Sequence, residues 1–439
     1  MKIIVKILSA LFLLLVVIVV FMFAFDICPP QGPWISPPWC ASSSFKRPTY
    51  DMKIETSHLS QVKAVNMFDT WGRNYNFNML ENTRNDIESS FSRVAEMGAQ
   101  EVYVHDFQRA VYNDSKDNFA SLNYQIEDEV FLNDMRDESM TEEDLEKLVK
   151  AAHDKGLKLG IKQNMAFVDI GKYISKGLTG EIDSSVKEDY NKFNSSHSEE
   201  WVRDYFSKWE KRMLLRAELY NKHGVDIISL TPGWMGPTFQ GQEALANELN
   251  KQLITNVRKA FDGQIQVELS FYGILDGVDG KEDWTKYDYY KSADIKEVRV
   301  YNLPTDKYKV SDKADMAQIQ VGIDELLKDL DSWSGQQGIK LSIFFSPFSY
   351  PNAINNGIVE YMDVMNSQIK LTEKDWDHQA IAWQAFFNEI TKYQNIERIT
   401  ANNFWWDDAM DPDVKVKISI SPSFRNKPAE EVIKQWFIK

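Results

Sequence analysis

The feature of this 439-residue sequence that most constrains its fold is a regular alternation of strand-like and helix-like segments from residue 61 onward. Eight short apolar segments have the character of buried strands, and a segment with helical periodicity follows seven of them. Parallel strands need a crossover between them, and this crossover is usually a helix. Eight such units favour a closed barrel over an open sheet. The sequence therefore predicts an α/β fold, a (β/α)8 TIM barrel over residues 61–439.

The expected elements follow one another with short connections. The strands are expected at residues 62–68, 101–104, 157–161, 225–230, 265–271, 297–301, 340–345 and 398–404. The helices are expected at residues 83–97, 141–155, 199–222, 242–261, 323–333, 374–393 and 427–436. We expect a long acidic loop over residues 111–140, and only the connection between the fifth and sixth strands lacks a clear helix.

Residues 1–25 have the pattern of a membrane anchor. Lys2 and Lys6 precede an almost unbroken apolar run, Ile7–Phe25. About 20 apolar residues span a bilayer as a helix, whereas the apolar part of a cleaved secretory signal usually has about 7–15. The residues up to Cys28 match neither a small-residue cleavage site nor a lipoprotein box, which favours an uncleaved signal anchor. The lysines then stay in the cytoplasm and the barrel lies outside it, at the cell surface, or is secreted if the segment is cleaved.

Residues 26–60 are expected to form an extracytoplasmic stalk. The segment Cys28–Cys40 contains five prolines, which makes it too stiff and too poor in backbone donors for a helix or a central strand. In an oxidising compartment Cys28 and Cys40 could form a disulfide, or both could remain free thiols.

Composition argues against several partners and cofactors. The chain has 50 Lys and Arg against 65 Asp and Glu, a net charge of -15, which disfavours nucleic-acid binding. The six histidines are scattered and the two cysteines are too few for a multi-cysteine zinc site, so no metal is expected. No glycine-rich phosphate loop follows a strand, so no nucleotide and no other cofactor is expected either.

Amide, aromatic and carboxylate residues recur where the expected strands end. In a TIM barrel these ends meet at one rim, where the chemistry takes place. Amides and carboxylates hydrogen-bond to sugar hydroxyls, and the apolar faces of sugar rings stack on aromatic planes. A carbohydrate is therefore the expected partner, beside the membrane. The expected binding residues are Asp69, Trp71, Asn164, Trp234, Tyr272, Asn302, Tyr350, Asn403, Trp405 and Trp406.

Two aspartates are the candidates for acid–base work. Asp106 lies beside His105 at the end of the second strand, and Asp407 follows the last strand. The alternative for each is a rim residue that binds backbone amides or a neighbouring arginine. Glu268 and Arg299 lie within adjacent strands, and because a charge in a buried strand must be paired we expect an ion pair between them, or else the floor of the site.

Several ordered segments resemble glycoside hydrolase family 113, a family of (β/α)8 barrels in the retaining clan that includes β-mannanases. Residues Thr141–Lys162 are similar to the second helix and third strand of that family. Asp377-His378-Gln379-Ala380 resembles the start of its seventh helix, and Ser421–Glu431 resembles the entry to its closing helix. The resemblance covers about residues 61–439 and implies a barrel that acts on a β-linked polysaccharide.

The same resemblance places two substitutions at the catalytic positions of the family. Gly233 stands where the general acid/base Glu is expected, and Pro347 stands where the nucleophile Glu is expected. Neither residue can transfer a proton or attack an anomeric carbon. Three readings follow: a membrane-anchored glycoside hydrolase with displaced carboxylates, a catalytically inactive carbohydrate-binding relative, and an envelope scaffold protein. The first is slightly favoured because Asp69, Asp106 and Asp407 could still meet in one cleft.

Overall fold

The computed structural model describes most of the barrel region. The described residues are 48–52, 54–67, 81–112, 121–128, 142–167, 197–232, 237–270, 284–303, 307–311, 313–355, 373–405 and 420–439. The anchor predicted over residues 1–25, most of the stalk and both cysteines lie outside these ranges. Among the described helices, none combines the length and the apolar character needed to cross a bilayer.

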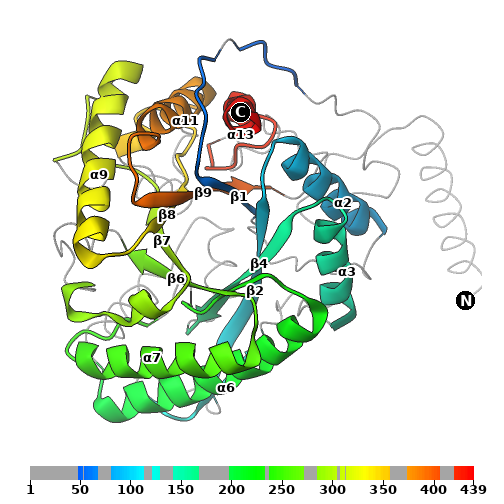
Figure 1. Cartoon of the computed structure of the whole chain (residues 1–439), viewed down its shortest axis with the longest axis vertical. Coiled ribbons are helices and arrows are strands. Elements are labelled where there is room, and N and C mark those ends of the chain that lie inside the picture. Colours follow the sequence, from blue (N-terminus) through cyan, green and yellow to red (C-terminus); the bar gives the residue numbers. More distant parts are fainter. Residues whose placement is uncertain are drawn as a thin grey trace, which may run out of the picture.

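Eight parallel strands close into a barrel (Figure 1). Around the barrel they follow the order β1, β9, β8, β7, β6, β5, β4, β2, and a pairing between β1 and β2 closes the ring. This confirms the predicted TIM-type barrel. Its strands are β1 (Val62–Met67), β2 (Glu101–Tyr112), β4 (Lys158–Ala166), β5 (Ile227–Ser229), β6 (Gln264–Ser270), β7 (Ile295–Val300), β8 (Leu341–Phe345) and β9 (Ile396–Phe404).

The helices lie around the outside of this ring (Figure 1). They are α2 (Glu81–Glu96), α3 (Glu142–His153), α6 (Glu199–His223), α7 (Glu243–Ala260), α9 (Met316–Gln337), α11 (Trp376–Ile390) and α13 (Pro428–Ile438). In the described part of the connection between β6 and β7 there are two short 3-10 turns, η2 (Trp284–Lys286) and η3 (Tyr289–Ser292). Helix α9 begins seven residues earlier than expected, because Asp315 and Gln318 form a reciprocal capping box at its start.

The acidic segment after the second strand is partly a strand, which corrects the predicted loop over residues 111–140. β2 continues to Tyr112, and its last residues pair antiparallel with β3 (Tyr124–Asp128). Tyr124 anchors this hairpin, since its ring is buried against Phe167 and Trp201. The hairpin therefore extends beyond the carboxyl end of the barrel.

Side chains alternate between two environments along each strand. On β2, Val102 and Val104 belong to the apolar core between the strands and the helices, whereas Tyr103 packs with Ala64 and Ile227 of other strands inside the barrel. This alternation decides which polar residues point into the barrel and which point toward a helix.

Candidate functional site

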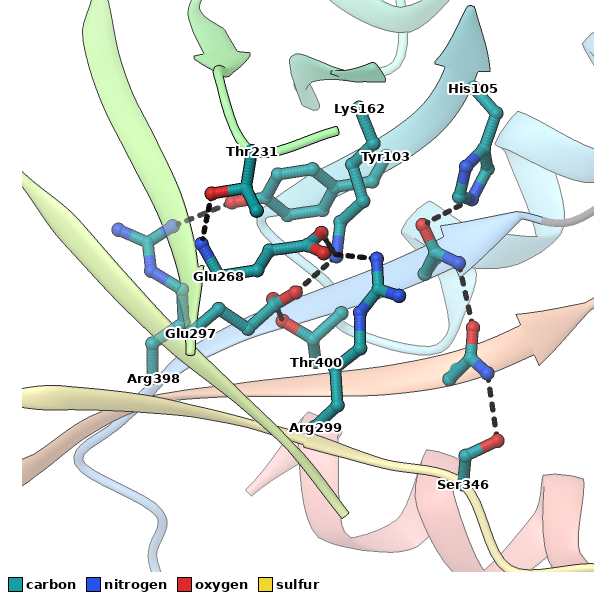
Figure 2. Close-up of polar contacts among 12 residues, drawn as sticks. Tyr103, His105, Lys162, Thr231, Glu268, Glu297, Arg299, Ser346, Arg398 and Thr400 are labelled. Atoms are coloured by element: carbon teal, nitrogen blue, oxygen red, sulfur yellow. Dashed lines mark hydrogen bonds and ion pairs between the residues drawn. The ribbon is translucent and has the colours of Figure 1, made fainter. Parts of the chain in front are cut away.

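The centre of the barrel holds a network of buried charges (Figure 2). The Lys162 ammonium on β4 lies 3.4 Å from a Glu268 carboxylate oxygen and also contacts Glu297 on β7. Arg299 contacts the other oxygen of Glu268, and the Thr400 hydroxyl donates to Glu297 over 2.8 Å. The predicted ion pair between Glu268 and Arg299 is confirmed. Because TIM-barrel interiors are mostly filled by branched apolar side chains, this charged layer is unusual and must be internally neutralised.

A second ion pair lies at the opposite edge of the same network. Arg398 on β9 contacts Glu101 on β2, and the Tyr103 hydroxyl donates to Glu101 over 3.3 Å. The Tyr103 ring fits against Gly160, where any added Cβ would come within 2.5 Å of the ring. The Lys162 ammonium lies 5.2 Å from the centroid of this ring. The tyrosine thus links the two ion-pair groups.

Nearer the carboxyl ends of the strands, a row of hydrogen bonds crosses four strands and ends at Ser346, the residue after β8. The Asn164 amide donates to His105 Nδ1 over 2.7 Å, and His105 Nε2 donates to Asn66 Oδ1 over 3.1 Å. Asn66 donates to Asn402 over 2.6 Å, and Asn402 donates to the Ser346 hydroxyl over 2.7 Å. Figure 2 shows this row running from His105 to Ser346. All bonds run in one direction, which fixes the imidazole with its proton on Nε2.

The surroundings keep this imidazole neutral. Burial lowers the pKa of His105 well below its ordinary value, and the positive charges of Lys162 and Arg299 lower it further. Asn164 follows Lys162 by two residues on β4, and Asn402 follows Thr400 by two on β9. The neutral row therefore forms a layer above the ion pairs, on the side where TIM-barrel sites are found.

This layer supplies hydrogen-bond donors and acceptors but no acid pair. Hydrolysis of a glycosidic bond needs two carboxyl groups, about 5–5.5 Å apart for retention or about 6.5–9.5 Å for inversion. The three glutamates of the described barrel interior, Glu101, Glu268 and Glu297, are each held by a lysine or an arginine. Within the described residues, the barrel interior is therefore suited to binding hydroxyl groups rather than to acid–base chemistry.

Asp106 lies on the other face of β2. Its carboxylate accepts a hydrogen bond from Tyr220 over 2.6 Å and lies 3.0 Å from Arg216 Nε, both on α6. Gln163 in turn donates to the Tyr220 hydroxyl over 3.1 Å. The carboxylate is buried between strand and helix, whereas His105 beside it faces the interior. This placement favours the arginine-bound alternative for Asp106 over the acid–base role expected from its position.

The other expected binding residues in the described ranges differ in their surroundings. Asn164 belongs to the polar row. The Asn302 amide donates to the carbonyl of the adjacent Leu303 and to that of Asn355, which follows β8. Tyr350 is 1% exposed in a small apolar cluster, and Trp405 is 4% exposed. Of these four residues, Asn164 is the one that belongs to the polar row.

Asn403 has an unusual backbone conformation. Its φ is 73°, in the left-handed region that asparagine tolerates better than most residues, and it lies just after Asn402 of the row. The remaining expected residues, Asp69, Trp71, Trp234, Tyr272, Trp406 and Asp407, lie outside the described residues, as does Gly233.

Pro347 is the second residue after β8, and the side chain that bonds to the polar row there is that of its neighbour Ser346. Ser346 accepts from Asn402, whereas the Pro347 carbonyl accepts from Gln379 on α11 over 2.9 Å. Six described interior residues were not expected from the sequence: Asn66, Glu101, Tyr103, Glu297, Arg398 and Thr400. The signal that could have found them is the two-residue period, because each shares a strand face with another polar or small interior residue.

Comparisons with solved structures find barrels of the same fold. A GH113 β-1,4-mannanase in complex superposes with a TM-score of 0.55 at 12% identity, covering 88% of this chain and 100% of that chain. A second GH113 β-1,4-mannanase structure gives 0.55 at 13% identity, covering 87% and 100%. The GH113 β-mannanase AaManA from Alicyclobacillus acidocaldarius gives 0.52 at 13% identity, covering 88% and 98%. No protein-family model and no curated protein matches the sequence. The chain is therefore a TIM barrel with the fold of the GH113 β-mannanases.

Proposed function

We propose that this chain is a glycoside hydrolase-like protein that binds a β-linked glycan at the carboxyl-end mouth of its barrel. The observation that carries the proposal is the neutral row from Asn164 to Ser346, which holds amide and hydroxyl groups above a layer of neutralised charges. Groups of this kind recognise sugar hydroxyls without needing a charged ligand. The solved structures with the same fold are named as β-1,4-mannanases, so β-1,4-linked mannan is the first glycan to test.

Binding without hydrolysis is favoured over hydrolysis. The resemblance puts Gly233 and Pro347 at the two catalytic positions, and Asp106, the first substitute, is engaged by Arg216 on the helix side of β2. Removing both carboxyl groups should abolish most of the chemical acceleration and leave the sugar contacts in place.

Titration calorimetry of the full chain with β-1,4-linked mannooligosaccharides tests this proposal. Asn164→Ala removes the first donor of the row, so the affinity should fall about tenfold, as expected for one lost hydrogen bond. Asn250→Ala, on α7 outside the barrel, is the matched control and should leave the affinity unchanged. Failure of the wild-type chain to bind any β-linked oligosaccharide, or an equal loss in both variants, would refute it.

We also propose that residues 1–25 anchor the chain in a membrane, with the barrel outside the cytoplasm. The proposal rests on the apolar run Ile7–Phe25 behind Lys2 and Lys6. The chain should stay with the membrane after an alkaline carbonate wash, and protease added from outside should degrade the barrel. Release of the whole barrel into the medium would show that the segment is cleaved.

A further inference from the structure

A cavity of about 450 Å3 opens at the end of the barrel opposite the polar row. Its wall includes Lys296 near the start of β7, Lys340 just before β8, and Glu397 near the start of β9. The wall also includes Lys291 of η3, together with Gly335 and Gly338 at the end of α9. All these residues precede or begin strands, so the cavity lies at the amino-terminal face of the barrel.

The charge of this wall contrasts with that of the whole chain. Three lysines and one glutamate line the cavity, which gives it an excess of two positive charges in a chain of net charge -15. Nearby surface lysines are neutralised: Lys251 lies 2.7 Å from Asp288, and Lys286 lies 3.0 Å from Glu243. Among the described residues, the cavity lysines form no such ion pair.

Lys296 is the most enclosed of the three lysines. Among the described residues, its ammonium hydrogen-bonds to the Asp294 carbonyl, at 3.4 Å, and burial lowers its pKa despite the negative charges of Glu397 and Asp294 nearby. Removing a charge from water without a close counter-ion costs free energy, and a bound anion would offset that cost.

The end of α9 leaves room for a ligand. A Cβ at Gly338 would meet no atom within 4 Å, whereas Asn395 already lies close against Gly335, so the open part of this wall is at Gly338. The carbonyls of Ser334 and Gly335, which would repel an anion, already accept hydrogen bonds from the backbone of Ile339 and Gly338. The helix end still carries a partial negative charge, so the attraction for an anion must come from the lysines of the wall.

We infer that this cavity binds a phosphate group, with Lys291, Lys296 and Lys340 as its cationic partners. A phosphate monoester carries a charge of about -1.5 to -2 at neutral pH, which matches the local excess of two positive charges, and lysine is a common phosphate ligand. The phosphate group could belong to a small molecule or to a lipid headgroup. The site lies on the other face of the barrel and does not depend on glycan binding.

The test uses the full chain and inorganic phosphate as the probe, with binding followed by the phosphorus NMR line width. The double variant Lys291→Gln/Lys340→Gln should weaken binding severalfold, up to about thirtyfold, since each exposed ion pair contributes up to about 1 kcal/mol. Lys155→Gln is the matched control, because this exposed lysine precedes β4, directly across the barrel from β8. It should bind phosphate like the wild type.

Vesicles distinguish the two sources of the phosphate group. If sedimentation with phosphatidic acid vesicles exceeds that with phosphatidylcholine vesicles, and the double variant loses this excess, the group is carried by a lipid. If phosphate binding is lysine-dependent without such an excess, the ligand is a small phosphate ester. The inference would be overturned if the wild type showed no saturable phosphate binding, or if Lys155→Gln weakened binding as much as the double variant. Either result is independent of the glycan titration.

Discussion

His105 shows how a single residue can be fixed in one protonation state. It is held between the amides of Asn164 and Asn66, and it lies close enough to Lys162 and Arg299 for their charges to oppose its protonation. An imidazolium would have to donate from both nitrogens, yet Nδ1 faces an amide donor. The residue is therefore suited to a constant hydrogen-bonding role rather than to proton transfer.

The neutral state of His105 makes the free energy of unfolding depend on pH. The folded pKa of His105 lies below its ordinary value of 6.5, so below about pH 6.5 the unfolded chain binds a proton that the folded chain excludes. The free energy of unfolding should fall as the pH falls through 6.5, and His105→Gln should remove this component. Between pH 7 and 5 the wild type should lose up to about 2 kcal/mol more than the variant in urea unfolding. Parallel pH profiles would contradict the buried neutral state.

Asp106 gives a second prediction at this scale. Asp106→Ala leaves Arg216 buried without its carboxylate, and breaking such a pair costs about 3–5 kcal/mol. Denaturant unfolding should show a loss of this size, and Asp106→Ala/Arg216→Met should recover part of it. If Asp106 instead acted on the substrate, the single variant would keep its stability and lose sugar release from any glycan that the wild type cleaves.

At the scale of elements, the packing of β4 against β2 includes one close contact, between Gly160 and the Tyr103 ring. Gly160 on β4 lets the Tyr103 ring lie flat against the strand, which positions the tyrosine hydroxyl beside Glu101 and Arg398. Gly160→Ala would place a Cβ 2.5 Å from this ring. Overpacking of this kind costs about 1–3 kcal/mol. Thermal unfolding should detect the loss, and a smaller residue in Tyr103→Leu/Gly160→Ala should reduce the penalty. An unchanged melting temperature in Gly160→Ala would contradict the contact.

The site is harder to predict from the sequence than the barrel, because β2 and β4 extend further than their apolar residues indicate. The alternation of strands and helices was sufficient for the barrel because apolar strand cores and helical periodicity are visible in the sequence. The polar residues beyond Val104 carry no strand signature, yet backbone pairing with β4 and β3 extends β2 to Tyr112. Side chains from Lys162 to Asn164 consequently lie within β4 instead of after it.

The side of the strand on which a residue lies is partly predictable from the sequence. Val102 and Val104 mark the helix-facing side of β2, and Asp106 continues their period, so its contact with α6 was predictable. The partners of the interior charges were less accessible, because Lys162 and Glu297 come from strands separated by 135 positions in the sequence. Only the closed ring brings them together.

At the scale of the whole molecule, the described part of the barrel interior combines three acidic and three basic side chains in its ion pairs. Glu101, Glu268 and Glu297 balance Lys162, Arg299 and Arg398, so the interior is neutral although the chain as a whole is strongly acidic. A neutral, hydrogen-bonding floor fits a neutral sugar, whereas the positive excess at the opposite face fits an anion. The two ends of one barrel thus favour different ligands.

A crystal structure of the full chain with a bound β-1,4-linked mannooligosaccharide would decide whether the mouth is a glycan site. We expect an intact oligosaccharide at the carboxyl end of the barrel, with sugar hydroxyls about 2.7–3.2 Å from polar groups of the row that begins at Asn164. A mouth filled by the protein's own side chains, with the sugar bound elsewhere or not at all, would contradict the proposal.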